Sequence, residues 1–325
     1  MPSVSVIIPI YNSGRYLERC LDSVLSQSLE DIEVICVDDA SVDESQLILV
    51  RRALADSRIK VVSLAENSGA AQARNAGLDL AKGDYVFFHD SDDWIDRDYL
   101  DAMYRRAVST AQDVTVNANY MYEYEDTSKS VRGPLFGFDG KKEGFYPPYE
   151  VQYRFMCSLW TRLYKRKYLD DNKIRFLLGK DGGEDVFFVG LAELLQEKSY
   201  VFFGPYYHYF QSDNSLSKRK DIAFQCFKFY RALLKELESR SRSDGCIQFQ
   251  LLRSLNFENP EEYDAVRSFL LEVKSKVLAN QNDYVVGDLV FMNAMIDSPD
   301  HELFKRNYKR ALLSLVTRNR INDSQ

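Results

Sequence analysis

Apolar runs of strand length alternate with helical apolar periodicity along the first 120 residues, and this alternation constrains the fold most. Residues 4–9 form a β-branched run, and apolar residues then recur at helical spacing from Tyr16 to Leu25. The pattern continues with predicted strands at 32–37, 59–64, 85–89 and 114–118, and predicted helices at 41–55, 69–81 and 98–108. Continuously apolar strands that are each followed by a helix predict a mostly parallel sheet with helices on both faces.

The regular alternation of strand and helix patterns ends after about residue 120. The periodicity fails from about Tyr120 to Pro148, which indicates a long excursion or hairpin over the sheet. Structure resumes near Val151, with a predicted helix at 186–195 and aromatic strands at 200–203 and 206–210, and the pattern is mainly helical beyond Asp221. A chain of 325 residues has room for about two domains, so we expect an α/β domain at 1–220 and a mainly helical domain at 221–325.

The distribution of charge excludes one class of partner. Residues 1–110 hold 11 Lys and Arg against 19 Asp and Glu, and the whole chain has a formal charge of -7. Because proteins that bind nucleic acid carry a clustered basic face, nucleic acid is excluded as the main partner. Five widely spaced cysteines predict buried thiols in a reducing cytosol. The amino terminus has no basic region typical of a secretory signal, and no apolar run has the length of a membrane span, so we expect a cytoplasmic protein.

Polar and acidic residues follow four of the predicted strands, at 9–12, 38–41, 66–69 and 90–93. Each group alone is explained by turns and helix caps, and Ser41 with Glu44 fits a capping box for the second helix. However, the carboxyl ends of parallel strands meet at one edge of a sheet, where ligands bind. Two of the four ends carry paired aspartates, which favours a ligand site.

The segment Asp90-Ser91-Asp92-Asp93 is the strongest candidate within this edge. Neighbouring carboxylates repel each other, and a hard divalent cation with oxygen ligands would neutralise them. The alternative is a solvated acidic turn that leads into the next helix. The chain has neither a P-loop nor a G-x-G-x-x-G motif, so a diphosphate would be held through the ion. Asp39 is suited to accept a hydrogen bond from a nucleobase, or to cap a helix.

Several motifs together resemble inverting family 2 glycosyltransferases with the GT-A fold. In order they are VIIPIYN at 6–12, VDDASVD at 37–43, NSG and ARNAG within 67–77, GDYVFFHDSDDW at 83–94, WTRLY at 160–164 and GEDVFF at 183–188. The resemblance covers roughly the first 215 residues, and the segment 221–325 carries no family motif.

The resemblance implies a UDP-sugar donor with Mn2+ or Mg2+, and it assigns roles to matching residues. Asp92 would be the direct metal ligand, with Asp90 as the other aspartate of the pair. Arg74 would contact the diphosphate or brace the pocket. Asp185 would be the general base, beside Glu184. The donor would contact Pro9, Tyr11, Asn12, Asp39, Asn67, Gly69, Arg74, Asp90 and Ser91.

Other segments support two interpretations each. Trp160 would stack on an acceptor sugar or pack in the core, and His208 would be a further metal ligand or a packing residue. The stretch 211–217 resembles a loop that closes over the donor, and the basic residues 218–220 would meet phosphates or solvent. The basic amphipathic segment His301 to Gln325 would lie on the inner face of an anionic membrane or pack on its own domain.

These features predict a metal-dependent inverting glycosyltransferase that moves a hexose or N-acetylhexosamine from a UDP-sugar to a saccharide or lipid-linked acceptor in bacterial surface-polysaccharide synthesis. The alternatives are a sugar nucleotidyltransferase, which needs a glycine- and basic-rich phosphate loop, and an inactive nucleotide-sugar binding protein. A glycoside hydrolase would use two carboxylates but has no need of Asp39 or a metal. The donor sugar, the acceptor, the linkage, and whether the chain is a monomer or a homo-oligomer stay open.

Overall fold

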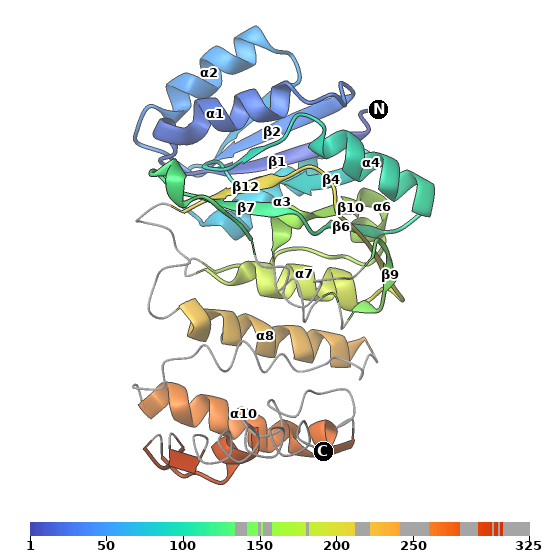
Figure 1. Ribbon diagram of the computed structural model, residues 1–325. Helices are drawn as coiled ribbons and strands as arrows, with labels where there is room; N and C mark the ends of the chain where they lie inside the picture. The colour runs from blue at the N-terminus through green and yellow to red at the C-terminus, as the bar shows by residue number, and fades with distance from the viewer. Residues whose placement is uncertain are drawn as a thin grey trace. The chain divides into compact units, whose positions relative to one another are not determined.

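The computed structural model describes residues 1–133, 142–148, 151, 158–179, 182–211, 222–240, 260–279, 292–300, 302–304 and 306–307. The strands are β1 Val4–Ile10, β2 Ile32–Asp38, β3 Ile59–Ser63, β4 Tyr85–Phe88, β5 Trp94–Ile95, β6 Val114–Asn117, β7 Tyr120–Glu123, β8 Val131–Arg132, β9 Gly144–Tyr146, β10 Arg162–Lys165, β11 Ser199–Phe202 and β12 Tyr207–Phe210. The helices are α1 Gly14–Leu25, α2 Ser45–Ala55, α3 Ala70–Leu80, α4 Tyr99–Thr110, α6 Arg166–Asp171, α7 Glu184–Leu194, α8 Ile222–Ser239 and α10 Pro260–Ala279 (Figure 1).

A large sheet of eight strands forms the centre of the α/β part, in the order β3-β2-β1-β4-β10-β6-β11-β9. The first four strands in this order are parallel, while β10 is antiparallel to both β4 and β6. The predicted α/β class with a mostly parallel sheet is therefore confirmed. The chain moves from β1 outward to β2 and β3, and then returns to β4 on the other side of β1. The strand order thus reverses between β1 and β4, where ligands bind in such sheets.

Alternation along the strands explains why helices cover both faces of this sheet. Val4, Val6, Ile8 and Ile10 of β1 join one hydrophobic core with buried residues of α1, α2 and α4. Ile7 points to the other face, where Gly77 of α3 lies against it: a Cβ on Gly77 would come within 2.4 Å of Ile7 Cγ2. On that second face, Phe88 of β4 also meets Phe188 of α7, with ring centroids 5.3 Å apart.

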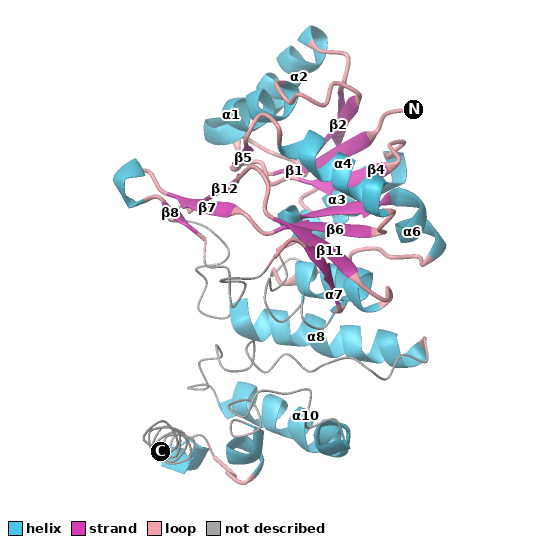
Figure 2. Ribbon diagram, turned by 45° about the vertical axis from the view of Figure 1, so that its right-hand side comes forward, coloured by secondary structure: helices cyan, strands magenta, loops and turns pink. Residues whose placement is uncertain are grey.

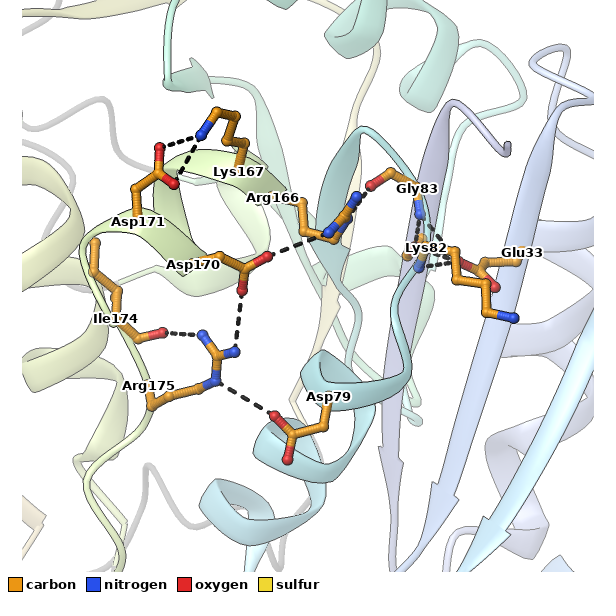
Figure 3. Close-up of polar contacts among 11 residues, drawn as sticks. Glu33, Asp79, Lys82, Gly83, Arg166, Lys167, Asp170, Asp171, Ile174 and Arg175 are labelled. Carbon is orange, nitrogen blue, oxygen red and sulfur yellow. Dashed lines mark hydrogen bonds and ion pairs between the residues drawn. The ribbon is translucent and has the colours of Figure 1, made fainter.

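Polar contacts fasten the amino-terminal ends of the central strands, at the edge opposite the predicted site (Figure 3). The Glu33 carboxylate accepts hydrogen bonds from the backbone N–H groups of Lys82 and Gly83, at 2.6 and 3.1 Å, and from Ser5 Oγ at 2.6 Å. Arg166 Nε donates to the Gly83 carbonyl at 2.7 Å. These bonds join β1, β2, the entrance to β4, and α6.

A buried ion pair ties β10 to α7. Arg162 Nε lies 2.8 Å from Glu193 Oε1, and both side chains are fully buried. Gln196 Nε2 donates to the other Glu193 oxygen at 3.0 Å, so the carboxylate is satisfied on both sides. A buried ion pair needs such additional hydrogen bonds to offset the cost of removing both charges from water.

A second, four-stranded sheet has the order β5-β12-β7-β8, and Figure 2 shows these short strands together. β7 and β8 form an antiparallel pair, with Met121 opposite Arg132, so the hairpin interpretation holds for residues 120–132, whereas β9 pairs with β11 in the large sheet. The sequence pattern does not predict β5, β7, β8, β9 or β10 as strands. β5 and β8 have two residues each, which is too short for a period-2 pattern to show.

One local prediction is wrong. α2 does not begin with a capping box of Ser41 and Glu44: the helix begins at Ser45, and Glu44 at its N-cap makes no side-chain capping bond. Ser41 Oγ instead accepts a hydrogen bond from the Asn12 backbone N–H at 2.9 Å. The Ser41 hydroxyl, which the local pattern predicts to cap α2, therefore makes a tertiary contact with the loop after β1.

The chain divides into two compact units. The first contains Met1–Lys218 and Phe229–Arg242, and the second contains Arg219–Lys228 and Ser243–Gln325. α8 crosses this division, and the predicted domains 1–220 and 221–325 stay a prediction. Among the described helices, none is long and apolar enough to cross a membrane. Cys20 and Cys36 are buried thiols, as expected, and Cys226 is half-buried, whereas Cys157 and Cys246 lie outside the described residues.

Candidate functional site

One buried guanidinium joins two of the sequence motifs. Arg74, on α3, places Nη2 at 2.9 Å from Asp90 Oδ1, in the turn that follows β4. Its Nη1 lies 2.6 Å from Glu184 Oε1 and 3.0 Å from Asp185 Oδ1, both in the first turn of α7. We call these four residues the Arg74 cluster. Of the two roles predicted for Arg74, the structure supports bracing, because the side chain spans the gap between the acidic turn and α7.

Glycines position the two acids of α7. Gly182 and Gly183 have φ angles of 86° and 92°, which L side chains rarely adopt, and Gly183 is the N-cap residue. The helix therefore begins at Glu184, two residues earlier than predicted, and both Glu184 and Asp185 lie in its first turn. Carboxylates are favoured there because the helix N-terminus carries partial positive charge.

The carboxylates of the Arg74 cluster perturb one another. Burial raises the pKa of Asp185, Arg74 lowers it, and Glu184 and Asp90 raise it again, which brings the pKa to about 8. Burial lowers the pKa of Arg74, but the three carboxylates outweigh this effect and the pKa of its guanidinium is raised. A carboxyl group with a pKa near neutrality is a stronger base than an ordinary aspartate and can accept a proton during catalysis.

The turn at Asp90–Asp93, here called the acidic turn, concentrates negative charge at the end of β4. Burial, and then the charge of Asp90, raise the pKa of Asp92 to about 6. Asp93 is fully buried, and burial together with Asp92 and Asp90 raises its pKa well above the usual range. Arg19 Nη2 donates to the Asp92 carbonyl at 2.8 Å, so the nearby cation contacts the backbone of the turn.

The carboxylates of the acidic turn fit a divalent cation that is bound partly by the protein and partly by a substrate. Within the residues that the structure describes, no group of three or more His, Cys, Asp and Glu side chains is arranged to hold a metal ion. Mg2+, however, is usually held by one or two carboxylates together with substrate phosphates and water. Asp92 and Asp90 supply hard oxygen donors at a partly exposed turn. Burial, and then the charge of Asp90, raise the pKa of Asp92, and a bound cation would favour its ionised form.

Asp39 ties the end of β2 to the start of α3. Its Oδ1 accepts the Ser68 backbone N–H at 2.7 Å and its Oδ2 accepts the Gly69 N–H at 2.8 Å. Gly69 is the N-cap of α3 and has a φ angle of 90°. Asp39 thus fastens the loop that precedes α3 and does not cap the first turn of a helix, and its contact with a nucleobase stays a prediction.

Other residues that were predicted to contact the UDP-sugar lie on β1 and on the loops after β1 and β3. Pro9 is buried within β1, Tyr11 is 49% exposed, and Asn67 is half-buried. Asn12 has a φ angle of 50°, and its Oδ1 accepts the Val42 N–H at 2.9 Å, which joins the loops that follow β1 and β2.

Ser91 also contacts the loop after β1, because its Oγ lies 2.6 Å from Ser13 Oγ. The acidic turn and the β1 loop are therefore neighbours at the carboxyl edge of the sheet. Contacts among α3 and the loops after β1, β2, β3 and β4 bring together Asn12, Asp39, Gly69, Arg74, Asp90 and Ser91 at this edge.

Trp160 packs in the core. Its ring stacks on Tyr207 at 4.5 Å and on Tyr209 at 5.3 Å between centroids, and the residue is 8% exposed. A sugar platform needs an open ring face, so this arrangement favours the packing interpretation over the acceptor role.

His208 is held between two carboxylates. Its Nδ1 lies 2.7 Å from Glu123 Oε1 and its Nε2 lies 3.0 Å from Asp96 Oδ1, while its ring stacks on Trp94 at 5.1 Å. Both ring nitrogens are thus engaged away from Asp90 and Asp92. The geometry favours packing over metal ligation.

Sequence reasoning missed Asp93 and Tyr207. Tyr207 Oη donates to Asp93 Oδ2 at 2.6 Å, and both residues are fully buried. Asp93 stands within the predicted acidic segment 90–93, which was an available signal, whereas Tyr207 is 114 positions away and has no local signal.

Several predictions concern residues that lie mostly outside the described part of the chain. The donor-closing loop is described only at Gln211, and residues 212–217 and the basic residues 218–220 lie outside the described residues. Of the basic segment 301–325, the structure describes only 302–304 and 306–307. The closing loop, the phosphate contacts and the membrane contact therefore stay predictions.

Comparisons with known proteins identify the family of the chain. A family model described as glycosyl transferase family 2 matches residues 5–171. TarP of Staphylococcus aureus strain N315, a poly(ribitol-phosphate) beta-N-acetylglucosaminyltransferase, is 30% identical over 279 residues, which cover 80% of this chain and 83% of TarP. Glycosyltransferase GlyA of Streptococcus pneumoniae is 33% identical over 222 residues, which cover 66% of this chain but only 31% of GlyA.

Solved structures share the fold. A crystal structure of S. aureus TarS 1-349 in complex with UDP-GlcNAc superposes with a TM-score of 0.69 at 23% identity, covering 98% of this chain and 92% of that one. This likeness confirms the expected GT-A fold. Because the family model matches about half of the sequence and TarP aligns over most of it, the chain belongs to glycosyl transferase family 2.

Proposed function

We propose that the chain is a metal-assisted inverting glycosyltransferase. It moves a hexose or N-acetylhexosamine from a UDP-sugar to a glycan or lipid-linked acceptor in bacterial surface-polysaccharide synthesis. The Arg74 cluster carries this proposal, because one buried guanidinium holds Asp90 of the acidic turn and Asp185 of α7 within 3.0 Å of its two terminal nitrogens. Arg74 thereby holds Asp90, which we assign to the departing nucleotide, and Asp185, which we assign to the acceptor, at one site.

The reaction needs one base. The acceptor hydroxyl gives its proton to the Asp185 carboxylate, its oxygen bonds to the anomeric carbon, and the bond from that carbon to the β-phosphate oxygen breaks to release UDP. Attack from the side opposite the leaving group inverts the anomeric centre. The raised pKa of Asp185, about 8, suits a base that must take a proton from a weakly acidic hydroxyl.

Asp92 and Asp90 would hold the divalent cation, and when bound this cation neutralises charge on the diphosphate leaving group. The chain's own residues place the donor beside it. Asp39 and Gly69 shape the loop before α3, while Asn12 joins the loops after β1 and β2. Tyr11, which is 49% exposed, offers a ring face to the base or ribose.

Names of relatives suggest which donors to test first. TarP is named for N-acetylglucosamine transfer to poly(ribitol phosphate), and a Bacillus spizizenii relative, 32% identical over 206 residues, is named a poly(ribitol-phosphate) beta-glucosyltransferase. A β product from an α-linked UDP-sugar requires inversion. We therefore place UDP-GlcNAc and UDP-glucose first, with poly(ribitol phosphate) as the first acceptor.

The test is UDP release by the purified chain across UDP-sugars and acceptors, with Mn2+ and then with EDTA. Asp185→Asn should lower turnover by about 10²- to 10⁴-fold, the usual contribution of a general base. Asp92→Asn should lower turnover and raise the Mn2+ concentration that is needed. The matched control is Asp171→Asn on α6, which removes an exposed carboxylate paired with Lys167 and should leave turnover unchanged.

Three results would overturn the proposal. If Asp92→Asn and Asp185→Asn both keep wild-type turnover, the mechanism is wrong. If UTP and a sugar 1-phosphate yield pyrophosphate while no UDP-sugar is consumed, the chain is a nucleotidyltransferase. UDP-sugar binding without turnover under any condition would instead support an inactive binding protein.

A further inference from the structure

The buried aspartate of the acidic turn is fastened to a strand that follows it by more than a hundred residues. Tyr207 Oη of β12 donates to Asp93 Oδ2 at 2.6 Å, and the Phe210 backbone N–H donates to Asp93 Oδ1 at 2.7 Å. Asp93 has no exposed surface, so these two bonds occupy both oxygens of a carboxylate that is removed from water. A buried carboxylate is tolerated only when it is hydrogen-bonded in this way.

The same tyrosine hydroxyl reaches the first aspartate of the turn. The Asp90 backbone N–H donates to Tyr207 Oη at 3.4 Å, so one oxygen links the backbone at Asp90 to the side chain of Asp93. Both ends of the D-x-D-D run are therefore tied to Tyr207, and Asp92 lies between them.

Aromatic packing determines where this hydroxyl lies. The Tyr207 ring is fully buried, stacks on Trp160 at 4.5 Å, and meets Phe87, Tyr99 and His89 at 6.4, 6.0 and 5.4 Å between centroids. A ring surrounded on several sides has one available rotamer, so its hydroxyl is a fixed point rather than a mobile one.

Backbone pairing holds the far side of the turn to the same strand. β5, which directly follows Asp93, pairs with β12, with Trp94 opposite His208 and Ile95 opposite Tyr207. The Asp96 carboxylate accepts the Tyr206 N–H at 2.7 Å. The acidic turn therefore has little freedom to spread in response to repulsion among its carboxylates.

We propose that Asp93 and Tyr207 are positioning residues that hold Asp90 and Asp92 in place for the divalent cation of the donor diphosphate. This inference rests on the proposed function. Neither side chain would touch the ion. Groups that orient metal ligands commonly change metal affinity by 10- to 100-fold when they are removed.

If Tyr207 had a purely structural role, its hydroxyl would matter no more for Mn2+ binding than that of another buried tyrosine. Tyr99 provides this comparison. Tyr99 is equally buried, packs against Tyr207 at 6.0 Å, and donates its hydroxyl to the Trp160 carbonyl at 3.2 Å, away from the acidic turn. Tyr207→Phe and Tyr99→Phe each remove one buried hydroxyl from the same aromatic cluster. Only Tyr207→Phe releases Asp90 and Asp93.

The experiment is a titration with Mn2+ in the presence of saturating UDP, with free Mn2+ measured by electron paramagnetic resonance and melting temperatures recorded in parallel. We expect Tyr207→Phe to weaken Mn2+ binding by about tenfold or more and Tyr99→Phe to stay within about twofold of wild type. Equal affinities for the two variants, whether both unchanged or both weakened, would overturn the inference.

Two further measurements distinguish failure of the proposed function from failure of this inference. If the wild type with UDP binds no Mn2+, the metal-assisted function itself fails, whatever the variants do. If Tyr207→Phe does not fold, Asp93→Asn replaces it, because the amide keeps the size of the side chain but has one oxygen, which cannot accept both the Tyr207 hydroxyl and the Phe210 N–H at the two positions that Oδ2 and Oδ1 occupy. Asp93→Asn should also bind Mn2+ about tenfold more weakly, and wild-type affinity would contradict the proposal.

Discussion

Arg74 sets the electrostatics of the site at the scale of single residues. One guanidinium faces the carboxylates of Asp90, Glu184 and Asp185, so the Arg74 cluster keeps an excess of negative charge when all three acids are ionised. Burial raises the pKa of Asp185, Arg74 limits the rise, and the charges of Glu184 and Asp90 add to it. The same residue therefore braces the site and governs how easily the proposed base loses its proton.

The consequence is a specific pH profile. Since Asp185 accepts a proton only when ionised, kcat/KM should rise with pH, bend near pH 8, and level off above it. Arg74→Gln removes a cation that lowers this pKa, so the bend should move to higher pH. The measurement is UDP release at saturating Mn2+ between pH 6 and about pH 9.5. Arg175→Gln, which alters the ion pairs with Asp170 and Asp79, should leave the bend in place, and an unshifted bend for Arg74→Gln would exclude this electrostatic role.

At the scale of elements, close approach of α3 to β1 positions both Arg74 and the loop before it. Gly77 lies three residues after Arg74 on α3, and a Cβ there would come within 2.4 Å of Ile7 Cγ2. Ile7 is fully buried in a central strand and has no room to turn away. The absence of a side chain at Gly77 therefore permits the distance at which Arg74 reaches Asp90 and α7.

We expect Gly77→Ala to destabilise the fold. Alanine gains about 0.5–1 kcal/mol of helix propensity over glycine, whereas overpacking a core costs about 1–3 kcal/mol, so the net loss should be about 1–2 kcal/mol. Urea denaturation measures it. Gly144→Ala on β9 is the control, because its Cβ would meet nothing within 4 Å and stability should not fall. Equal stability of the two variants would show that α3 can move away from β1 without cost.

At the scale of the whole molecule, the acidic charge of the first 110 residues leads to an expectation about how the proposed donor binds. Six aspartates and one basic residue, Arg97, lie between Asp90 and Asp101, beside the place proposed for a diphosphate. Like charges repel a nucleotide unless a cation separates them. The overall charge thus predicts that metal and donor bind together.

Removal of metal should therefore weaken nucleotide binding. We expect the Kd for UDP, measured by calorimetry, to rise by about tenfold or more when Mn2+ is replaced with EDTA, a change of at least 1.4 kcal/mol. Raising NaCl to about 0.5 M in EDTA should recover part of the affinity, since salt screens the acidic edge. Equal affinity with Mn2+ and EDTA would contradict a bridging cation.

Local patterns in the sequence determined much of this protein. Continuous apolar runs located the long strands of the α/β part, because these strands are buried on both faces, and an apolar repeat of 3.6 located its helices. The ordered motifs indicated the family and the positions of Asp90, Asp92 and Asp185. Each of these inferences depends on residues that are close together in the chain.

Only the tertiary structure decided which of those residues meet. Arg74 and Glu184 are 110 positions apart, and Asp93 and Tyr207 are 114 apart, so no local repeat records either contact. The capping pattern at Ser41 failed for the same reason, since its hydroxyl bonds to the loop after β1, and Trp160 proved to be packed against Tyr207. The order of strands in the sheet brings these partners together, and that order is set by the packing of the whole domain.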